Sequence, residues 1–231
     1  MPAKAPASVV DLRAYATGAP PTRDWLTGRA TPAFADDRAR VVAFAPMGEG
    51  RVDALPGDEF VILLSGEVTL DSARGATVIT AGRSAVLPAG LSFSWRAAAG
   101  TVAIVVTCPA ETGAADRAVP IDETAPLQPS SPPIADLLVG PTPACRNHTD
   151  YRSNDGEFTC GTWDSTPYHR RAMVYRHIEL MHLLEGSVTF EDASGSVTFR
   201  EGDVFLAARG AECAWLSEVH VKKVYAIHRP A

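Results

Sequence analysis

Three alternating residues, Tyr175, His177 and Glu179, place a phenol, an imidazole and a carboxylate on one short stretch of the chain. Successive side chains of a β-strand point to opposite faces, so these three share one face if the stretch is extended. Lys223 and Tyr225 alternate in the same way near the C-terminus. A carboxylate beside a lysine suits acid–base chemistry, because the ammonium keeps the carboxylate ionised and stabilises a developing anion.

The stretches that would position these residues occur twice. Residues 59–95 and 179–215 align without a gap when the chain is shifted by 120 residues. The matched positions include Glu59 and Glu179, Gly66 and Gly186, Gly75 and Gly195, Gly82 and Gly202, Gly90 and Gly210, and Trp95 and Trp215. Recurring glycines indicate recurring tight turns, since glycine adopts a positive φ without steric cost. The chain is therefore an internal duplication.

Within each copy, short apolar or β-branched runs alternate with glycine turns. Residues 60–66 and 180–186 end in glycine, and residues 101–107 and 221–227 form a final strand-like run. Neither copy has a convincing amphipathic helix. Short regular strands joined by glycine turns predict an all-β barrel or sandwich.

A segment rich in proline, serine and acidic residues, AVPIDETAPLQPSSPP at residues 118–133, separates the copies. This composition is typical of a linker or an extended strap. We therefore predict an N-terminal domain at residues 1–117 and a C-terminal domain at residues 134–231. The 231 residues are enough for two small domains that each bury a core.

The overall composition limits the classes of molecule that the protein is expected to bind. Hydrophobic residues make up 46% and charged residues 21%, and the net charge of −6 comes without blocks of Lys or Arg. This argues against nucleic acid and membrane partners and leaves a small-molecule ligand, with a homodimer as an open alternative. No apolar run is long enough to span a bilayer, and the N-terminus lacks the apolar core of a secretory signal. None of the four cysteines forms a CxxC pair, so we expect reduced thiols in a cytoplasmic protein.

The spacing from Glu179 to Gly186, followed by GDVFLAARG, resembles the motifs of the cupin superfamily, and residues 82–90 have the shape of its second motif. The segments GTWDSTP, HLLEGSVTF, GDVF and VKKVYAI resemble the cupin subfamily of ureidoglycine aminohydrolase and ethanolamine-utilisation Q-type domains. The resemblance covers about residues 40–108 and 157–229. It implies an all-β chain of two tandem cupin barrels, which are double-stranded β-helices of the jelly-roll type, and so a bicupin.

Cupins that bind a metal use two histidines, the glutamate and a third histidine, and this chain lacks those histidines. Met173 and Tyr175, or Ala172 and Val174 with a shift of one residue, hold the first two places before Glu179, and Cys213 holds the last. One carboxylate per barrel does not hold a transition metal, so we expect neither metal ligands nor a cofactor. A zinc site of Glu179, Cys213 and His177 stays open as an alternative, as does manganese, iron or nickel held by atypical ligands.

The family position of Glu179 implies that it points into the second barrel, together with Tyr175 and His177. The second copy also carries Lys223 and Tyr225 where the first copy has apolar residues, so we expect the site in the second barrel and a structural role for the first. The predicted catalytic residues are Glu179, Lys223 and Tyr225, and the predicted ligand-binding residues are Tyr175, His177, Cys213, Trp163 and Met173.

With Glu179 as general base and Lys223 as its charge partner, the expected function is metal-free acid–base chemistry on a small nitrogenous or carboxylate metabolite. Two alternatives stay open: a non-enzymatic small-molecule sensor or interaction protein, and a metal-dependent aminohydrolase, isomerase or dioxygenase with atypical ligands. In a further alternative, the Glu179–Lys223 pair only stabilises the barrel. In another, Lys223 points outward and Lys222 points inward. Arg170 and Arg171 lie in a loop-like segment that we expect to be solvated, with attraction of an anionic substrate to the pocket as the alternative.

Overall fold

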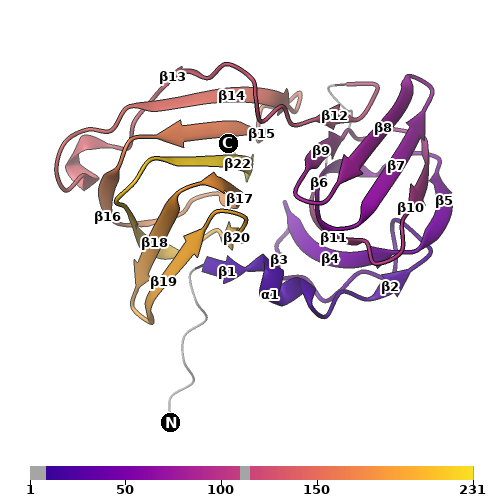
Figure 1. Ribbon diagram of the computed structural model, residues 1–231, viewed down its shortest axis with the longest axis horizontal. Coiled ribbons are helices and arrows are strands. Elements are labelled where there is room, and N and C mark those ends of the chain that lie inside the picture. The colour runs from indigo at the N-terminus through magenta and orange to yellow at the C-terminus, as the bar shows by residue number, and fades with distance from the viewer. Residues whose placement is uncertain (1–8, 110–114, 231) are drawn as a thin grey trace, which may run out of the picture. The chain divides into compact units, whose positions relative to one another are not determined.

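The computed structural model describes residues 9–109 and 115–230, and almost all of its regular structure is β-strand (Figure 1). The chain divides into two compact units. The N-terminal unit contains Leu12–Ile121 and Asp150–Cys160, and the C-terminal unit contains the strand Val9–Asp11, Asp122–Thr149 and Gly161–Arg229. Helix is limited, among the described residues, to the single turns α1 (Leu12–Ala16) and η1 (Ala135–Leu137). No helix there has the length and apolar character needed to cross a membrane.

Two sheets build the N-terminal unit. The larger runs in the order β12-β9-β6-β11-β4-β2, with β3 beside β4, and the smaller runs β5-β10-β7-β8. Their bounds are β2 (Pro21–Thr22), β3 (Phe34–Ala35), β4 (Arg40–Pro46), β5 (Gly48–Val52), β6 (Gly57–Ser65), β7 (Glu67–Ser72), β8 (Gly75–Thr80), β9 (Ser84–Leu87), β10 (Phe93–Ala97), β11 (Val102–Pro109) and β12 (Val119–Pro120). Apolar side chains of both sheets share one core, as in a jelly-roll barrel.

The C-terminal unit repeats this arrangement. Its larger sheet runs β1-β20-β17-β22-β15-β14-β13, and its smaller sheet runs β16-β21-β18-β19. Their bounds are β1 (Val9–Asp11), β13 (Gln128–Ser130), β14 (Cys145–Arg152), β15 (Phe158–Ser165), β16 (Tyr168–Val174), β17 (Ile178–Glu185), β18 (Ser187–Asp192), β19 (Gly195–Arg200), β20 (Val204–Ala207), β21 (Glu212–Ser217) and β22 (Val221–His228). Side chains of both sheets again form one core.

The duplication is visible in the turns. Gly90 has a φ of 80° and donates its backbone N–H to the Leu55 carbonyl at 2.7 Å. Gly210, the matched residue, has a φ of 85° and donates to the Tyr175 carbonyl at 2.8 Å. The prediction of an all-β chain with two jelly-roll barrels is therefore confirmed.

The unit boundaries differ from the predicted ones. β1 pairs with β20, so residues 9–11 belong to the C-terminal unit. The end of β14, the start of β15 and the turn between them (residues 150–160) group with the N-terminal unit, although both strands belong to the larger C-terminal sheet. Within the expected linker, β12 pairs with β9 and β13 pairs with β14. In each of these pairings, a segment remote in sequence hydrogen-bonds to the edge strand of a sheet. The local sequence contains no pattern from which such a pairing could be predicted.

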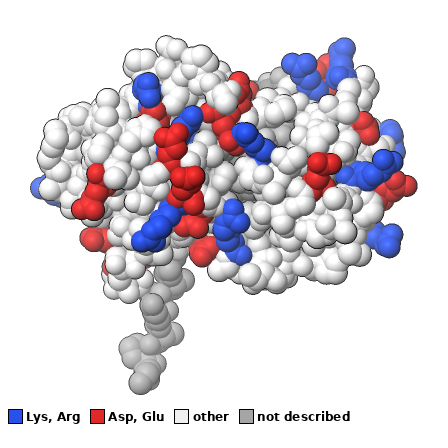
Figure 2. All heavy atoms as spheres, in the orientation of Figure 1, with Lys and Arg blue, Asp and Glu red and all other residues white. Residues whose placement is uncertain are grey.

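The charged side chains are mixed rather than segregated on the face drawn in Figure 2, where basic and acidic groups lie among one another. A nucleic-acid-binding face would instead gather basic groups. The first eight residues, on which the prediction of no secretory signal partly rests, lie outside the described residues.

Candidate functional site

The two central strands of the larger C-terminal sheet carry the predicted catalytic residues. In the register of β17 and β22, Glu179 lies opposite Ile227, Met181 opposite Tyr225, and Leu183 opposite Lys223. Residues opposite each other in an antiparallel pair share a face. Because Met181 and Leu183 belong to the barrel core, this face points into the barrel. The alternative with Lys222 inward is wrong, since Lys223 is buried and Lys222 Nζ donates instead to the Glu123 carbonyl.

The smaller sheet supplies a second set of inward side chains. Tyr168, Arg170 and Met173 of β16 lie opposite Ser217, Trp215 and Cys213 of β21, and the last two belong to the core. Arg170 is only 5% exposed. The expectation that Arg170 is solvated is therefore wrong, because this stretch is a strand with an irregular register between Arg170 and Met173 rather than a loop. Arg171 is exposed, as expected, and donates to the Asp136 carbonyl.

A buried ion pair lies at the centre of the site. Lys223 Nζ is 2.7 Å from Glu179 Oε1 and 3.2 Å from Met181 Sδ. The same ammonium lies 4.8 Å from the ring centroid of Trp163 and 5.0 Å from that of Trp215. Aromatic faces attract a cation and exclude water, so the pair is held in a largely apolar wall.

The second oxygen of Glu179 faces His177. His177 Nε2 lies 3.4 Å from Glu179 Oε2, and its Nδ1 lies 3.5 Å from a guanidinium nitrogen of the exposed Arg229. An arginine only donates, so the tautomer of His177 that accepts at Nδ1 donates to Glu179 through Nε2. Burial acts to raise the pKa of Glu179, but the Lys223 ammonium and His177 outweigh it and hold this pKa well below its usual range. Glu179 is thus ionised at neutral pH and is a weak base while paired.

Tyr175 connects this pair to Arg170. The Tyr175 ring centroid is 5.3 Å from that of His177, and its hydroxyl is 3.4 Å from an Arg170 nitrogen. Arg170 also donates to the Cys213 carbonyl at 3.2 Å. Burial raises the pKa of the Tyr175 phenol, and it raises the pKa of the Cys213 thiol to about 11. Both groups are therefore neutral donors and not anions at neutral pH.

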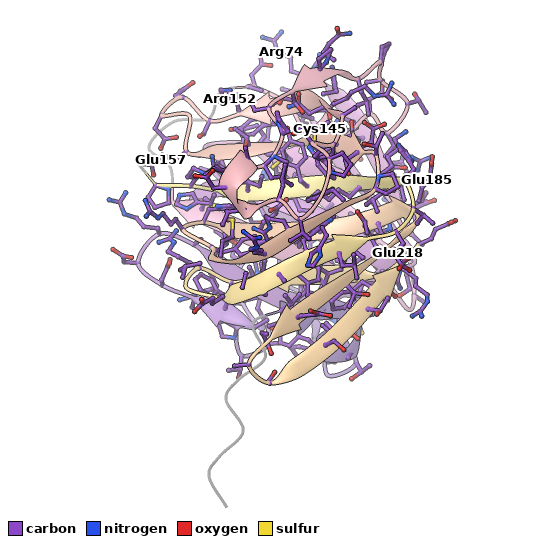
Figure 3. The ribbon with its side chains drawn as sticks, turned by 90° about the vertical axis from the view of Figure 1, so that its left-hand side faces the viewer. Arg74, Cys145, Arg152, Glu157, Glu185 and Glu218 are labelled. Carbon is purple, nitrogen blue, oxygen red and sulfur yellow. The ribbon has the colours of Figure 1, made fainter. Side chains whose placement is uncertain are left out.

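The remaining predicted residue, Tyr225, faces β14. Its hydroxyl is 2.9 Å from the Thr149 hydroxyl. Cys145, labelled in Figure 3, lies on the same strand and is buried. Burial raises the pKa of the Cys145 thiol, and the Lys223 ammonium opposes this. The sequence analysis missed β14 because its sequence, CRNHTDYR, lacks an apolar alternation.

The structure thus brings most of the predicted residues together. Glu179, Lys223, His177 and Trp163 are in direct contact, and Tyr175 adjoins them through His177. Met173 and Cys213 are opposite each other on the neighbouring sheet. The inward-facing residues that the sequence analysis missed or set aside are Tyr168, Arg170, Thr149 and Cys145, which lie on β16 and β14, two polar strands that it did not predict.

The donors at this position do not fit the metal that many cupin sites hold. Oε1 of Glu179 accepts a hydrogen bond from the Lys223 ammonium, which would repel a metal cation at this carboxylate. Within residues 9–109 and 115–230, no three His, Cys, Asp or Glu side chains gather as metal ligands would. A transition metal here would be a cation beside Lys223, and its ligands other than Glu179 and His177 would have to be a neutral phenol, thioether or thiol.

Comparisons with known proteins agree with this fold. Residues 152–225 match the family model of the EutQ-like cupin domain. The chain is similar to a protein of unknown function of the DUF861 family from Pseudomonas syringae pv. tomato str. DC3000, with 29% identity, a TM-score of 0.83, and coverage of 90% of this chain and 91% of that chain. No curated protein matches the chain.

Two more distant structures share the fold alone. A cupin 2 conserved barrel domain protein from Leptotrichia buccalis is 10% identical, with a TM-score of 0.62 and coverage of 96% of both chains. Streptomyces albus HEPD, solved with 2-hydroxyethylphosphonate and Fe(II) bound, is 11% identical, with a TM-score of 0.52 and coverage of 88% of this chain and 71% of that chain. The chain therefore has a cupin fold, and its residues 152–225 are similar to the EutQ-like cupin domain.

Proposed function

We propose that the protein is a bicupin whose C-terminal barrel binds a small polar metabolite and transforms it by acid–base chemistry with its own side chains. Glu179 is the general base, and Lys223 is its charge partner. The observation that carries this proposal is the buried pair at 2.7 Å between Trp163 and Trp215. A buried ion pair is costly compared with apolar packing, and such pairs concentrate at functional sites.

The low pKa of Glu179 sets the order of events. Glu179 is a weak base while Lys223 neutralises it, so the ligand has to engage Lys223 first. A substrate oxygen that draws the ammonium away lets the pKa of Glu179 rise toward its ordinary range. A proton then passes from a substrate C–H or N–H to Glu179, and Lys223 stabilises the negative charge left on the substrate oxygen.

The other predicted residues complete this proposal. Tyr225 and Tyr175 are neutral phenols that donate to substrate oxygens, and His177 orients Glu179. Trp163, Met173 and Cys213 form the wall against which the ligand packs. We assign the chain more finely to the cupin subfamily of ureidoglycine aminohydrolase and EutQ-type domains, and the match of residues 152–225 to the EutQ-like cupin domain supports the EutQ-type part of this assignment.

We also infer a cytoplasmic location and a reaction without a tightly bound transition metal. The first inference is supported by four buried cysteine thiols, none of which is in a disulfide. The second is supported by the ammonium of Lys223 on the glutamate of the cupin motif. Elemental analysis of protein purified without chelators or a histidine tag tests it, and near-stoichiometric manganese, iron, nickel or zinc would overturn it.

A second candidate function is binding without turnover, as in a small-molecule sensor. The lowered pKa of Glu179 favours it, because a carboxylate locked in an ion pair is a weak base. The two candidates share one binding site and differ only in whether a proton is transferred.

One experiment tests both candidates. The full chain is incubated in D₂O with a panel of small hydroxy-, oxo- and ureido-carboxylates and their amides, and proton exchange and conversion are followed by NMR. We expect turnover of at least one compound, reduced about 100-fold or more in Glu179→Gln. Glu185→Gln, at the exposed end of the same strand, is the matched control and keeps full activity. Unchanged turnover in Glu179→Gln contradicts the first candidate, whereas a bound but unchanged compound supports the second.

A further inference from the structure

Arg170 is the second cation inside the C-terminal barrel, and its partners are unusual for a buried arginine. One terminal nitrogen donates to the Tyr175 hydroxyl at 3.4 Å and to the Cys213 carbonyl at 3.2 Å, and the guanidinium lies 5.3 Å from the Tyr175 ring centroid. All of these partners are neutral. Among the described residues, no carboxylate lies within ion-pair distance of Arg170, although its side chain offers five N–H donors.

The charges of the barrel interior do not balance. The Glu179 carboxylate is neutralised by Lys223, which leaves the charge of Arg170. Tyr175 and Cys213 are neutral, and burial likewise raises the pKa of Tyr168 well above its usual range. A buried charge is costly unless it is paired. Among these described groups one positive charge is therefore in excess, which suits one negative charge on a ligand.

Arg29 of the N-terminal barrel shows what a fully paired arginine looks like in this fold. Its two terminal nitrogens donate to the two oxygens of Glu59, at 2.8 and 3.2 Å. Its Nε and one terminal nitrogen also donate to the Trp25 carbonyl. Arg170 is buried as well, but among the described residues it has no carboxylate partner.

Tyr168 adds a polar group beside Arg170. The two residues are on the same face of β16, and the Tyr168 ring stacks on Trp215 with centroids 5.6 Å apart and planes 12° apart. Tyr168 and Trp163 both retain partial exposure although they face the interior. The side chains of this part of the barrel wall are therefore not completely sealed from solvent.

We propose that Arg170 is the anchor for a carboxylate group of the ligand, which lies between Tyr168 and Tyr175. This inference rests on the proposed function and narrows its substrate class to small monocarboxylates. A planar guanidinium matches a carboxylate with two parallel hydrogen bonds. A phosphate carries more than one charge at neutral pH and would exceed the single uncompensated cation.

The site is continuous from this anchor to the ion pair. Arg170 contacts Tyr175, Tyr175 packs on His177, and His177 contacts Glu179. A ligand held by its carboxylate at Arg170 therefore extends along this wall and presents its other end to Glu179 and Lys223.

The test uses a matched pair of probes, glycolate and glycolamide, which differ in charge and hardly in shape. Binding to the full chain is measured by saturation-transfer NMR and by thermal shift at constant ionic strength, with inorganic phosphate as a third probe. We expect glycolate to bind, glycolamide to bind much more weakly, and Arg170→Gln to weaken glycolate binding by about 30-fold or more. Arg170→Lys keeps part of the affinity. Equal binding of both probes, preference for phosphate, or unchanged affinity in Arg170→Gln would overturn the proposal.

A stability measurement separates an anchor from a structural brace. Without a probe, Arg170→Gln is expected to keep or raise the melting temperature, because it removes an uncompensated buried charge. Arg29→Gln, the matched variant, is expected to lower it, because it leaves Glu59 without its cation. An equal loss of stability in the two variants would mean that Arg170 is a brace and would overturn the proposal.

Glu179→Gln distinguishes this inference from the proposed function. It keeps Arg170 and removes the base, so glycolate binding is expected to persist or tighten while turnover is lost. Wild-type protein that binds glycolate through Arg170 and turns over no compound of the panel supports the anchor and contradicts the acid–base proposal. Turnover of uncharged compounds that is unaffected by Arg170→Gln contradicts the anchor and leaves the acid–base proposal in place.

Discussion

The two barrels carry the same glutamate in different settings. Glu59 is 1% exposed, and it accepts hydrogen bonds from Trp25 Nε1 at 3.0 Å, from Arg29 at 2.8 Å and from the Thr107 hydroxyl at 3.1 Å. Glu179 instead has one lysine and one histidine, at 2.7 and 3.4 Å. The N-terminal barrel thus closes on its glutamate with its own chain, whereas the partners of Glu179 suit replacement by a ligand.

Trp25 shows how complete this closure is. It is 1% exposed, and its ring contacts Phe44, Phe93 and Trp95 with centroids 5.2 to 5.8 Å apart. Trp25 and Arg29 both precede the aligned repeat. The repeat therefore specifies the barrel fold. Residues outside the repeat determine whether the interior around the glutamate is filled.

The largest expected effect on stability comes from removing the cation that pairs with Glu59 in the N-terminal barrel. Arg29→Gln leaves Glu59 buried without a cation, which should reduce the free energy of unfolding by about 3–5 kcal/mol. Urea unfolding followed by circular dichroism and tryptophan fluorescence measures this loss. Arg51→Gln is the control: Arg51 pairs with Asp53 at the surface, where such a pair contributes about 0–1 kcal/mol. Equal effects of the two variants would show that Glu59 does not need its arginine.

The same change in the other barrel is expected to cost less. Lys223→Met removes the cation from Glu179, but this carboxylate keeps His177 and is 11% exposed, against 1% for Glu59. A loss of about 2–3 kcal/mol is expected from the same unfolding measurement. Lys222→Met, on the outer face of the same strand, serves as the control. A loss as large as that of Arg29→Gln would mean that the two glutamates are equally locked.

A smaller effect is expected on the decline of the unfolding free energy at acidic pH. The folded pKa of Glu179 lies below its ordinary value of 4.5, so its contribution to stability is complete above that value and is lost as pH falls toward the folded pKa. Glu179→Gln should therefore flatten the decline of unfolding free energy below about pH 5. Asp58 of the N-terminal unit has the opposite sign, because burial raises its pKa and outweighs the hydrogen bonds from Ala89 and Tyr151. Asp58→Asn should accordingly steepen the decline that Glu179→Gln flattens.

The smallest effect tests whether the two barrels are equivalent where the repeat is strict. Gly90→Ala and Gly210→Ala place a side chain at φ values of 80° and 85°, with open space around each new Cβ atom. Only backbone strain remains, so each should cost about 1–2 kcal/mol, with the two values within about 0.5 kcal/mol. Clearly unequal losses would show that the two turns do different structural work.

The strict repeat explains what could be predicted. Recurring glycines determine recurring turns, and period-two alternation places Glu179 and Lys223 on inward faces once two strands are recognised. Arg170 could not be predicted in this way, because its strand is polar and has an irregular register. The Arg29–Glu59 pair could not be predicted either, since it joins a loop to a strand 30 residues away. Contacts of this kind depend on the path of irregular segments, which alternation does not encode.

The pairing of β1 with β20 has a consequence for how the protein can be divided. A fragment that begins at residue 134 keeps the whole second repeat but loses β1 and β13, which cover the outer edges of β20 and β14. Exposed strand edges recruit other chains and promote aggregation. The two repeats are therefore not interchangeable modules. A gene that encoded the second repeat alone would yield a barrel with unpaired strand edges, so selection would keep both halves in one reading frame.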